Sequence, residues 1–388
     1  MKKNKHHYVP KFYLRLFASD RLQSHAPKLI NLYNIKNNLI VENASLRDQC
    51  YRRKFYGHTN DLEDAFASFE GECSKLISRI LKEENLFHKG IPEYVLLLTF
   101  VVFQYLRTKR QTDEQNELFD SLCKTLLEEN IDHFTEDDWA EILGKDVKPL
   151  TKDELKNNKI TLENSIFISL SRSQSYINAI NDLEPLLILI GSHQHFVVSD
   201  NPVVNYNQYY QDLKELNNTG LVSRGLQLFL PLSPHCLLIL YDKDVYSLVS
   251  KQRKIYGITD KDLHFINLLQ YINSDQNIYF DSSEQINNVI SLGNNAKRFL
   301  KNRKAETLVF DSVQHEKPNR DSVLLVSHMK TINIELSLSF MKIKRTAKRV
   351  PLRERLINRY REELPDELSQ YEPPPKFPEL FVRRRNDK

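Results

Sequence analysis

The chain has 388 residues, of which 40% are apolar and 27% charged, a composition that excludes a largely disordered protein and predicts one large domain or two. Only 9 residues are glycine, which argues against Gly-rich phosphate-binding loops. The formal net charge of +4 is too small to predict a polyanionic partner, but nine Lys or Arg and a single acid, Glu354, lie between Lys342 and Arg361. We call residues 342–361 the basic strip.

Cysteine usage and hydropathy predict a cytoplasmic protein without a membrane segment. The four cysteines are scattered, with no Cys-x-x-Cys pair, and are expected to be reduced thiols. No signal peptide is recognised, and the most apolar stretch, 94–106, holds 13 residues, fewer than a membrane span needs. His193 and His195 form a His-x-His pair, but no third ligand follows at a suitable spacing, so no zinc site is predicted there.

The first half of the chain is predicted to be mainly helical around one β-hairpin. Pro10 suits the first position of a short helix. Residues 29–35 and 39–46 flank an Asn-containing turn and predict the hairpin. Apolar residues recur at helical spacing over 60–82. Further helices are predicted from Pro92 toward Glu129, after the Thr151–Glu154 capping box, and over 161–189 with an interruption at Pro185.

The second half of the chain changes to short apolar runs that predict strands. Three such runs, bounded by Pro, Asn or Asp, occupy residues 195–204, 226–232 and 236–242. Helices are predicted to return over 260–301. Three further strand-like segments follow at 306–313, 322–328 and 331–344. The sequence therefore predicts an α+β fold, with a mixed and mostly antiparallel central sheet packed by long helices.

Three regions are predicted: a core domain over 1–300, C-terminal strands with the basic strip over 301–361, and a tail over 362–388. The tail is Pro-rich and charged, so we expect an extended arm or disorder. The basic strip would supply sequence-independent affinity for a nucleic-acid backbone. Its candidate contacts are Lys344, Arg345, Lys348 and Arg349.

His6 and His7 stand directly before the first predicted helix, and two interpretations are open. In the first, the rings cap and pack at the start of the fold. In the second, a neutral imidazole near pH 7 accepts a proton or binds a metal ion. Because neighbouring side chains of an extended segment point to opposite faces, only one ring would face a given site, and we favour His7.

Ser199, Asp200 and Asn201 form a polar exit from the apolar residues 196–198, and Pro202 ends regular pairing. An Asx turn would explain these residues without a function, and it suits Asn201 better than Asp200. Alternatively, a carboxylate at the end of a buried strand is held rigidly at a cleft.

Gln104 and Arg107 share a face at the polar end of the helix that starts at Pro92, because they are three residues apart. Arg107 is suited to grip a phosphate or carboxylate through two hydrogen bonds. Capping of the sheet and a structural bridge to Asp200 are equally open. If these residues act in catalysis, we expect His7, Arg107 and Asp200 to converge on one cleft.

Five stretches occur in the order HHYVPKFYLRLFA, NDLEDAFASFEGE, FQYLRT, FVVSDNPV and LPLSP. Together they resemble the bacterial family catalogued as domain of unknown function 4238, over roughly residues 4–290. The resemblance implies shared polar positions at His7, Tyr8, Arg15, Arg107, Ser199, Asp200, Asn201 and Pro202. It also implies a setting in antiphage defence, but no reaction.

The leading hypothesis is a nucleic-acid-cleaving effector of bacterial antiphage defence. His7 would act as general base or acid, and Arg107 would stabilise charge on a phosphate. Asp200 would orient His7 or bind a divalent cation such as Mg²⁺ or Mn²⁺. The residues expected to bind substrate are His6, Tyr8, Arg15, Gln104, Ser199 and Asn201. The alternative is a non-enzymatic sensor or partner-binding subunit of a defence complex, in which these polar residues form a buried structural network.

Overall fold

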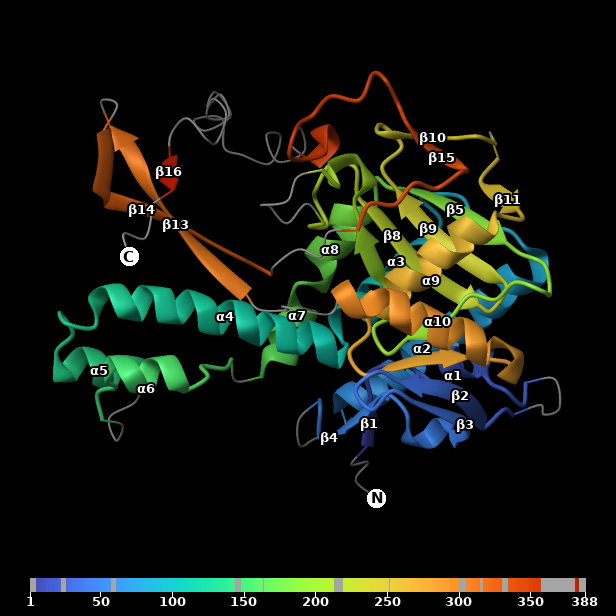
Figure 1. The fold of residues 1–388 in the computed structure, drawn as a ribbon, viewed down its shortest axis with the longest axis horizontal. Helices are drawn as coiled ribbons and strands as arrows, with labels where there is room; N and C mark the ends of the chain where they lie inside the picture. The colour runs from blue at the N-terminus through green and yellow to red at the C-terminus, as the bar shows by residue number, and fades with distance from the viewer. Residues whose placement is uncertain are drawn as a thin grey trace. The chain divides into compact units, whose positions relative to one another are not determined.

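The computed structural model describes residues 5–21, 26–56, 61–143, 148–162, 164–212, 219–250, 252–299, 305–314, 317–329, 334–356 and 381–383. The chain divides into two compact units. Unit 1 comprises residues 1–112, 166–301 and 331–358, and unit 2 comprises residues 113–165, 302–330 and 359–388. Helices occur together with mostly antiparallel sheets, so the predicted α+β class is confirmed (Figure 1).

Unit 1 is built around a five-stranded sheet with strand order β11-β5-β9-β8-β7. Its strands are β5 (Glu184–Leu189), β7 (Val204–Tyr206), β8 (Gln227–Ser233), β9 (Cys236–Tyr241) and β11 (Lys254–Tyr256). β11 pairs with β5 in parallel, and the other three pairings are antiparallel. The predicted helix over 161–189 is wrong in its last part, because Pro185 lies in β5, a continuous apolar run that is buried on both faces.

The two faces of this sheet contact two separate hydrophobic cores, as the alternation of side chains along a strand requires. In β9, Leu238 and Leu240 contact the first core, while Leu237 and Ile239 contact the second. The helices on the first core are α1 (Lys11–Leu14), α2 (Asp61–Glu83), α3 (Pro92–Leu106), α7 (Ser165–Ser171) and α8 (Ser173–Ile180). The second core is covered by α9 (Asp260–Asn273), which crosses in front of the sheet in Figure 1, and by α10 (Ile286–Ala296), drawn below α9.

The predicted helices of the first core are confirmed, with one break. Pro10 is the N-cap residue of α1, one position before the predicted first helical residue, and α2 spans residues 61–83, against the predicted 60–82. α3 starts at Pro92, but it ends at Leu106 with Arg107 as its C-cap residue, and the helical chain resumes as α4 (Lys109–Asn130). None of the helices in the described part of the chain combines the length and hydropathy needed to cross a membrane.

A second sheet of unit 1 carries the polar exit predicted at residues 199–201. Its strand order is β3-β2-β12-β6, and every pairing is antiparallel. The strands are β2 (Leu29–Asn34), β3 (Leu39–Ser45), β6 (Val198–Ser199) and β12 (Asn277–Phe280). β2 and β3 form the predicted hairpin. A separate antiparallel pair joins β1 (Lys5–His7) to β4 (Tyr51–Arg53).

The division into units differs from the predicted boundary at residue 300, because residues 331–358 belong to unit 1. β15 (Met341–Ile343) pairs with β10 (Tyr246–Leu248). Arg353, only 3% exposed, donates to Asp182 Oδ2 (2.8 Å) and to the backbone oxygens of Ser223 (3.0 Å) and Leu221 (2.8 Å). Part of the basic strip is therefore anchored in the core of unit 1.

Unit 2 combines helices with a three-stranded antiparallel sheet of order β14-β13-β16. Its elements include most of α4 and α5 (Glu136–Leu143), α6 (Lys152–Asn157), β13 (Ala305–Gln314), β14 (Lys317–Met329) and β16 (Phe381–Arg383). Leu127, Trp139 and Leu155 form a small core, and the predicted capping box at Thr151 is confirmed. Apart from β16, the predicted tail over 362–388 lies outside the described residues.

Candidate functional site

The two N-terminal histidines lie in β1 and are largely buried. His6 is 1% exposed, stacks on Tyr56 and accepts a hydrogen bond from the Tyr56 amide at Nδ1 (3.0 Å). His7 is 9% exposed, and its Nδ1 lies 3.0 Å from the backbone oxygen of Gln49. Because a carbonyl oxygen only accepts, Nδ1 of His7 carries the proton, and Nε2 of the neutral ring is left as a proton acceptor.

A polar pocket of about 400 Å³ is lined by Tyr8, the residue that follows His7, and we call it the hairpin pocket. It is lined by residues 48–53, which include the whole of β4, together with Tyr8, Gln276 and Asn277. Asp48, the one carboxylate in this lining, is paired with Lys5 (2.6 Å). Arg52 and Arg53 are exposed, and Lys5 Nζ lies 4.4 Å from the centre of the Tyr51 ring. Two arginines and an aromatic ring therefore line the same pocket as Tyr8, the residue that follows His7.

The pKa of His7 is lowered to about 4, chiefly by burial and further by the nearby Lys11 cation. An unfolded histidine binds its proton near pH 6.5, so the unfolded chain takes up a proton first as the pH falls. This group therefore contributes stability at neutral pH that is lost on acidification from about pH 6.5 toward pH 4.

The substitution His7→Asn is expected to reduce the acid sensitivity of the fold. Asparagine offers an N–H donor to the Gln49 oxygen but does not titrate. Between about pH 7 and pH 5 the wild-type chain should lose roughly 2 kcal/mol more of its free energy of unfolding than the variant does. Denaturant unfolding at both pH values measures this difference, and equal losses in the two chains would contradict the pKa assigned to His7.

Arg107 is completely buried and is held by protein groups. Its Nη1 donates to Glu70 Oε1 (2.9 Å), and its guanidinium lies 4.8 Å from the centre of the Phe66 ring. Gln104, also fully buried, accepts from Nε (3.1 Å) and Nη2 (2.8 Å) when its amide oxygen faces the guanidinium. The bridge to Asp200 left open by the sequence is not the pairing observed, since the carboxylate partner of Arg107 is Glu70.

Asp200 is buried at the end of β6 and binds backbone amides. Its Oδ1 accepts from the amide of Asp275 (2.8 Å), and its Oδ2 accepts from the amides of Gln276 (2.8 Å) and Asn277 (3.1 Å). Burial raises the pKa of Asp200 to about 6, and the three amide donors oppose that rise. Asp200 thus secures the segment between α9 and β12.

Ser199 and Asn201, on either side of Asp200, are bonded to α9 and to Thr108. Ser199 Oγ lies 3.0 Å from Gln270 Oε1 and 2.8 Å from the Asn201 backbone oxygen. Asn201 accepts from Thr108 Oγ1 (2.6 Å) and donates through Nδ2 to the Asn273 backbone oxygen (3.1 Å). These contacts agree with a structural role for the S-D-N-P segment. The bonds are made chiefly to α9, however, and not within a local Asx turn.

The predicted site residues are therefore placed in several surroundings. Tyr8 lines the hairpin pocket, and His7 is bonded to the backbone of Gln49, which also lines it. Arg107 and Asp200 are bonded to protein groups below the surface. Tyr56 links two of these groups, because its hydroxyl donates to the His7 backbone oxygen (3.2 Å) and interacts with the Arg107 guanidinium. Arg15 is exposed. The catalytic roles assigned to His7, Arg107 and Asp200 remain predictions.

The four predicted nucleic-acid contacts of the basic strip are not equivalent. Lys344 Nζ donates to the Lys243 backbone oxygen (2.6 Å). Arg349 pairs with Asp212 (2.9 Å) and lies over the rings of Tyr209 and Tyr210. The two positions exposed without such contacts are Arg345 and Lys348.

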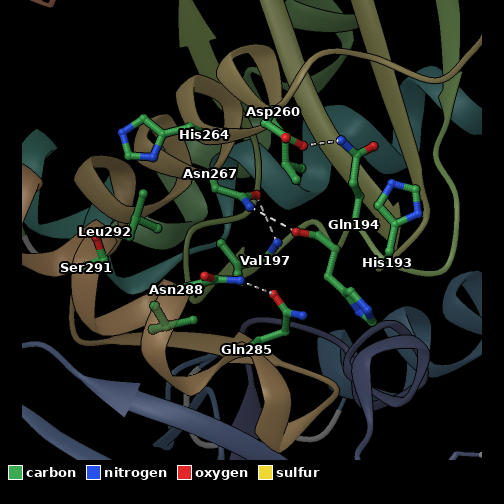
Figure 2. Close-up of a pocket in the computed structure, with 13 residues that line it drawn as sticks. His193, Gln194, Val197, Asp260, His264, Asn267, Gln285, Asn288, Ser291 and Leu292 are labelled. Carbon is green, nitrogen blue, oxygen red and sulfur yellow. Dashed lines mark hydrogen bonds between the residues drawn. The ribbon is translucent and has the colours of Figure 1, made fainter.

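A second pocket, which we call the histidine pocket, lies between the segment 193–197, α9 and α10, and has a volume of about 410 Å³. Figure 2 shows His193, Asp260, His264 and Asn288 around it. Hydrogen bonds connect the segment 193–197 to α9 in the pocket wall: Gln194 Nε2 donates to Asp260 Oδ1 (2.7 Å). Asn267 accepts from the Val197 amide (3.0 Å) and donates to the His195 backbone oxygen (2.9 Å).

His195 lines this pocket and belongs to a cluster with His235 and Asp281 that we call the triad. His195 Nδ1 lies 2.9 Å from Asp281 Oδ1, and its Nε2 lies 3.0 Å from the Ser192 backbone oxygen. The centres of the two imidazole rings are 4.7 Å apart. Hydrogen bonding to the Asp281 carboxylate raises the pKa of His195, while burial lowers the pKa of His235.

No metal site was predicted at His195, because no third ligand follows His193 and His195 at a suitable local spacing. Asp281 is 86 positions away and directly follows β12, and His235 directly precedes β9. Residues at strand ends that meet across a fold leave no fixed spacing in the sequence. The one available signal was that all three residues stand next to buried apolar runs.

Comparison with known proteins identifies the family of the chain. Searches of the curated proteins and of the solved structures found no match. The model of one family, described as "Protein of unknown function (DUF4238)", matches residues 5–284, which include the hairpin pocket, the triad and the S-D-N-P exit. The wall of the histidine pocket formed by residues 285–292 lies outside the match. The match covers well over half of the chain, so the chain belongs to the DUF4238 family.

Proposed function

We propose that this chain is a nucleic-acid-cleaving effector of bacterial antiphage defence, with the hairpin pocket as its phosphate-binding site. The defence setting rests on the family resemblance. The observation that carries the proposal is the composition of the hairpin pocket, in which Arg52 and Arg53 adjoin Tyr51 and the neighbours of His7. Arginine matches phosphate geometry, and aromatic rings stack on bases, so this combination suits a single-stranded nucleic acid.

The backbone around β4 supports a binding role for this strand. Cys50 and Lys54, which flank β4, both have left-handed φ angles, of 50° and 55°. Such angles are unfavourable for residues other than glycine and occur often at functional sites. Here they bracket Tyr51, Arg52 and Arg53 on a strand that pairs with β1.

His7 has a protonation state suited to a general base. The ring is neutral near pH 7, and Nε2 is its proton-accepting nitrogen. A bound phosphate would raise the pKa of His7 toward neutrality, because an anion favours the charged imidazolium. In the proposed reaction, Nε2 of His7 takes the proton of the water that attacks phosphorus, and the two arginines neutralise the phosphate. The P–O bond to the leaving sugar oxygen breaks, and that oxygen takes up a proton from solvent.

The double substitution Arg52→Ser, Arg53→Ser is expected to weaken both binding and cleavage of nucleic acid. Each lost phosphate contact should reduce the slope of log affinity against log salt by about 0.7–0.9. Labelled RNA, single-stranded DNA and duplex DNA, incubated with and without Mg²⁺ or Mn²⁺, measure cleavage, and a salt titration measures binding.

The matched control replaces two exposed lysines of unit 1 that line neither pocket, Lys36→Ser with Lys82→Ser. It removes the same charge and should leave affinity and salt slope close to the wild-type values. An equal loss in the control would attribute binding to net charge alone, and the hairpin pocket would then lose its assignment. No cleavage of any substrate by the wild-type chain would rule out the nuclease.

A second candidate is a non-enzymatic sensor or partner-binding subunit of a defence complex. It is favoured by the full burial of Arg107 and of the Asp200 carboxylate, whose contacts are with protein groups. Under this proposal the family positions in α3 and at the end of β6 stabilise the fold. Nucleic-acid binding without cleavage in the experiment above would favour the sensor.

A further inference from the structure

We infer that the triad of His195, His235 and Asp281 binds a first-row divalent transition-metal ion, with Zn²⁺ as the ion best suited to it. One ligand atom of each residue lies within 4.8 Å of those of the other two. Two imidazoles and one carboxylate form a donor set that zinc accepts in catalytic sites. Mg²⁺ and Ca²⁺ prefer oxygen ligands, so the triad does not suit them.

The surroundings of His195 point to a cation at this position. Its Nε2 faces the Ser192 backbone oxygen and its Nδ1 faces the Asp281 carboxylate, and both of these partners only accept hydrogen bonds. A neutral ring has one proton and can satisfy only one of the two contacts. With the proton on Nε2, the lone pair of Nδ1 is directed at a carboxylate, and a metal ion bound to both groups resolves that repulsion.

His235 is oriented as metal-binding histidines usually are. Its Nδ1 lies 3.0 Å from the Gln194 backbone oxygen, which fixes the proton on Nδ1 and leaves Nε2 as the donor to a metal. Both histidines of the triad therefore have one ring nitrogen bonded to a backbone carbonyl. Such outer contacts fix the tautomer and the direction of a ligand ring.

One member of the triad, His195, also lines the histidine pocket. Three protein ligands leave at least one position on a zinc ion for water or a substrate, which distinguishes reactive sites from closed structural ones. His195 lines the histidine pocket, together with the polar side chains of His264, Asn267 and Asn288. The triad would thus present its metal ion beside a polar pocket large enough for a small polar ligand.

Zinc binding by the full-length chain tests the inference directly, in the absence of nucleic acid. The chain is treated with a chelator, dialysed against Zn²⁺ and desalted, and the metal content per chain is measured. The wild-type chain should retain one equivalent of zinc. Asp281→Asn and His235→Asn should each weaken zinc binding by at least about tenfold, since each removes a direct ligand.

Each variant keeps much of the local structure. The substitution Asp281→Asn retains the shape of the carboxylate, and the side chain introduced by His235→Asn can still donate to the Gln194 oxygen. The matched control is His264→Asn, which removes another histidine of the same pocket and should bind zinc as the wild type does. Thermal melts without metal establish that all chains fold, and added zinc should raise Tm in the wild type and control only.

Two outcomes would overturn the inference. The first is a folded wild-type chain that retains no zinc, in which case His195 is a doubly protonated partner of Asp281. The second is an equal loss of zinc in the His264→Asn control, which would indicate binding by surface histidines. Because no nucleic acid is present, either outcome leaves the hairpin-pocket proposal standing, and a failure of that proposal leaves the triad untouched.

Discussion

Replacement of Arg107 by methionine is expected to lower the free energy of unfolding by about 3–5 kcal/mol. The guanidinium is fully buried, donates to Glu70, and lies over the Phe66 ring. Methionine fills similar volume, but it leaves the Glu70 carboxylate and the Gln104 amide without their partner. The loss is large because the buried Gln104 amide is left without a partner and Glu70, which is 23% exposed, regains only part of its hydration.

Arg15 provides the matched control for Arg107. The family resemblance gives both arginines as shared positions, but Arg15 is exposed. Arg15→Met should change stability by less than about 0.5 kcal/mol. Denaturant unfolding of the two variants compares them directly. If Arg107→Met is as stable as Arg15→Met but has lost nucleic-acid cleavage, the structural assignment fails and the predicted catalytic role is supported.

Local patterns predicted most of the fold because local physics determines those features. The β2–β3 hairpin, the start of α3 at Pro92 and the Thr151 capping box depend on residues close in sequence. Pro185 was misleading for a related reason. It was expected to interrupt a helix, whereas the Leu-Leu-Ile-Leu run behind it is buried between two cores, and burial on both faces outweighed the helical pattern.

The candidate site was harder to predict, because a sequence does not reveal which polar groups are buried. Arg107 and Asp200 stand at the ends of apolar elements, as predicted, but these ends lie under the surface. The partners that satisfy them are remote: Glu70 on α2 for the arginine, and the amides of residues 275–277 for the aspartate. The triad was missed for the same reason, because only the folded chain brings His235 and Asp281 to His195.

Asp200 offers the sharpest test between catalysis and structure. Asp200→Ala removes the acceptor of three part-buried backbone donors and should lower the free energy of unfolding by about 3 kcal/mol, at roughly 1 kcal/mol for each lost hydrogen bond. Asp200→Asn keeps one acceptor oxygen but directs an amide group at a backbone donor, so a smaller loss of about 1–3 kcal/mol is expected.

The two variants separate the roles because stability and activity need not change together. If Asp200 is structural, Tm should fall further in Asp200→Ala than in Asp200→Asn. The rate of cleavage, measured well below the Tm of each variant, should then fall only in proportion to the fraction of the chain that is folded. A catalytic Asp200 predicts that Asp200→Asn stays fully stable and loses cleavage, since the variant keeps the shape and loses the charge. The three amide contacts favour the structural outcome, because an oxygen that already accepts from the backbone of residues 275–277 is poorly placed to orient a histidine or hold a metal ion.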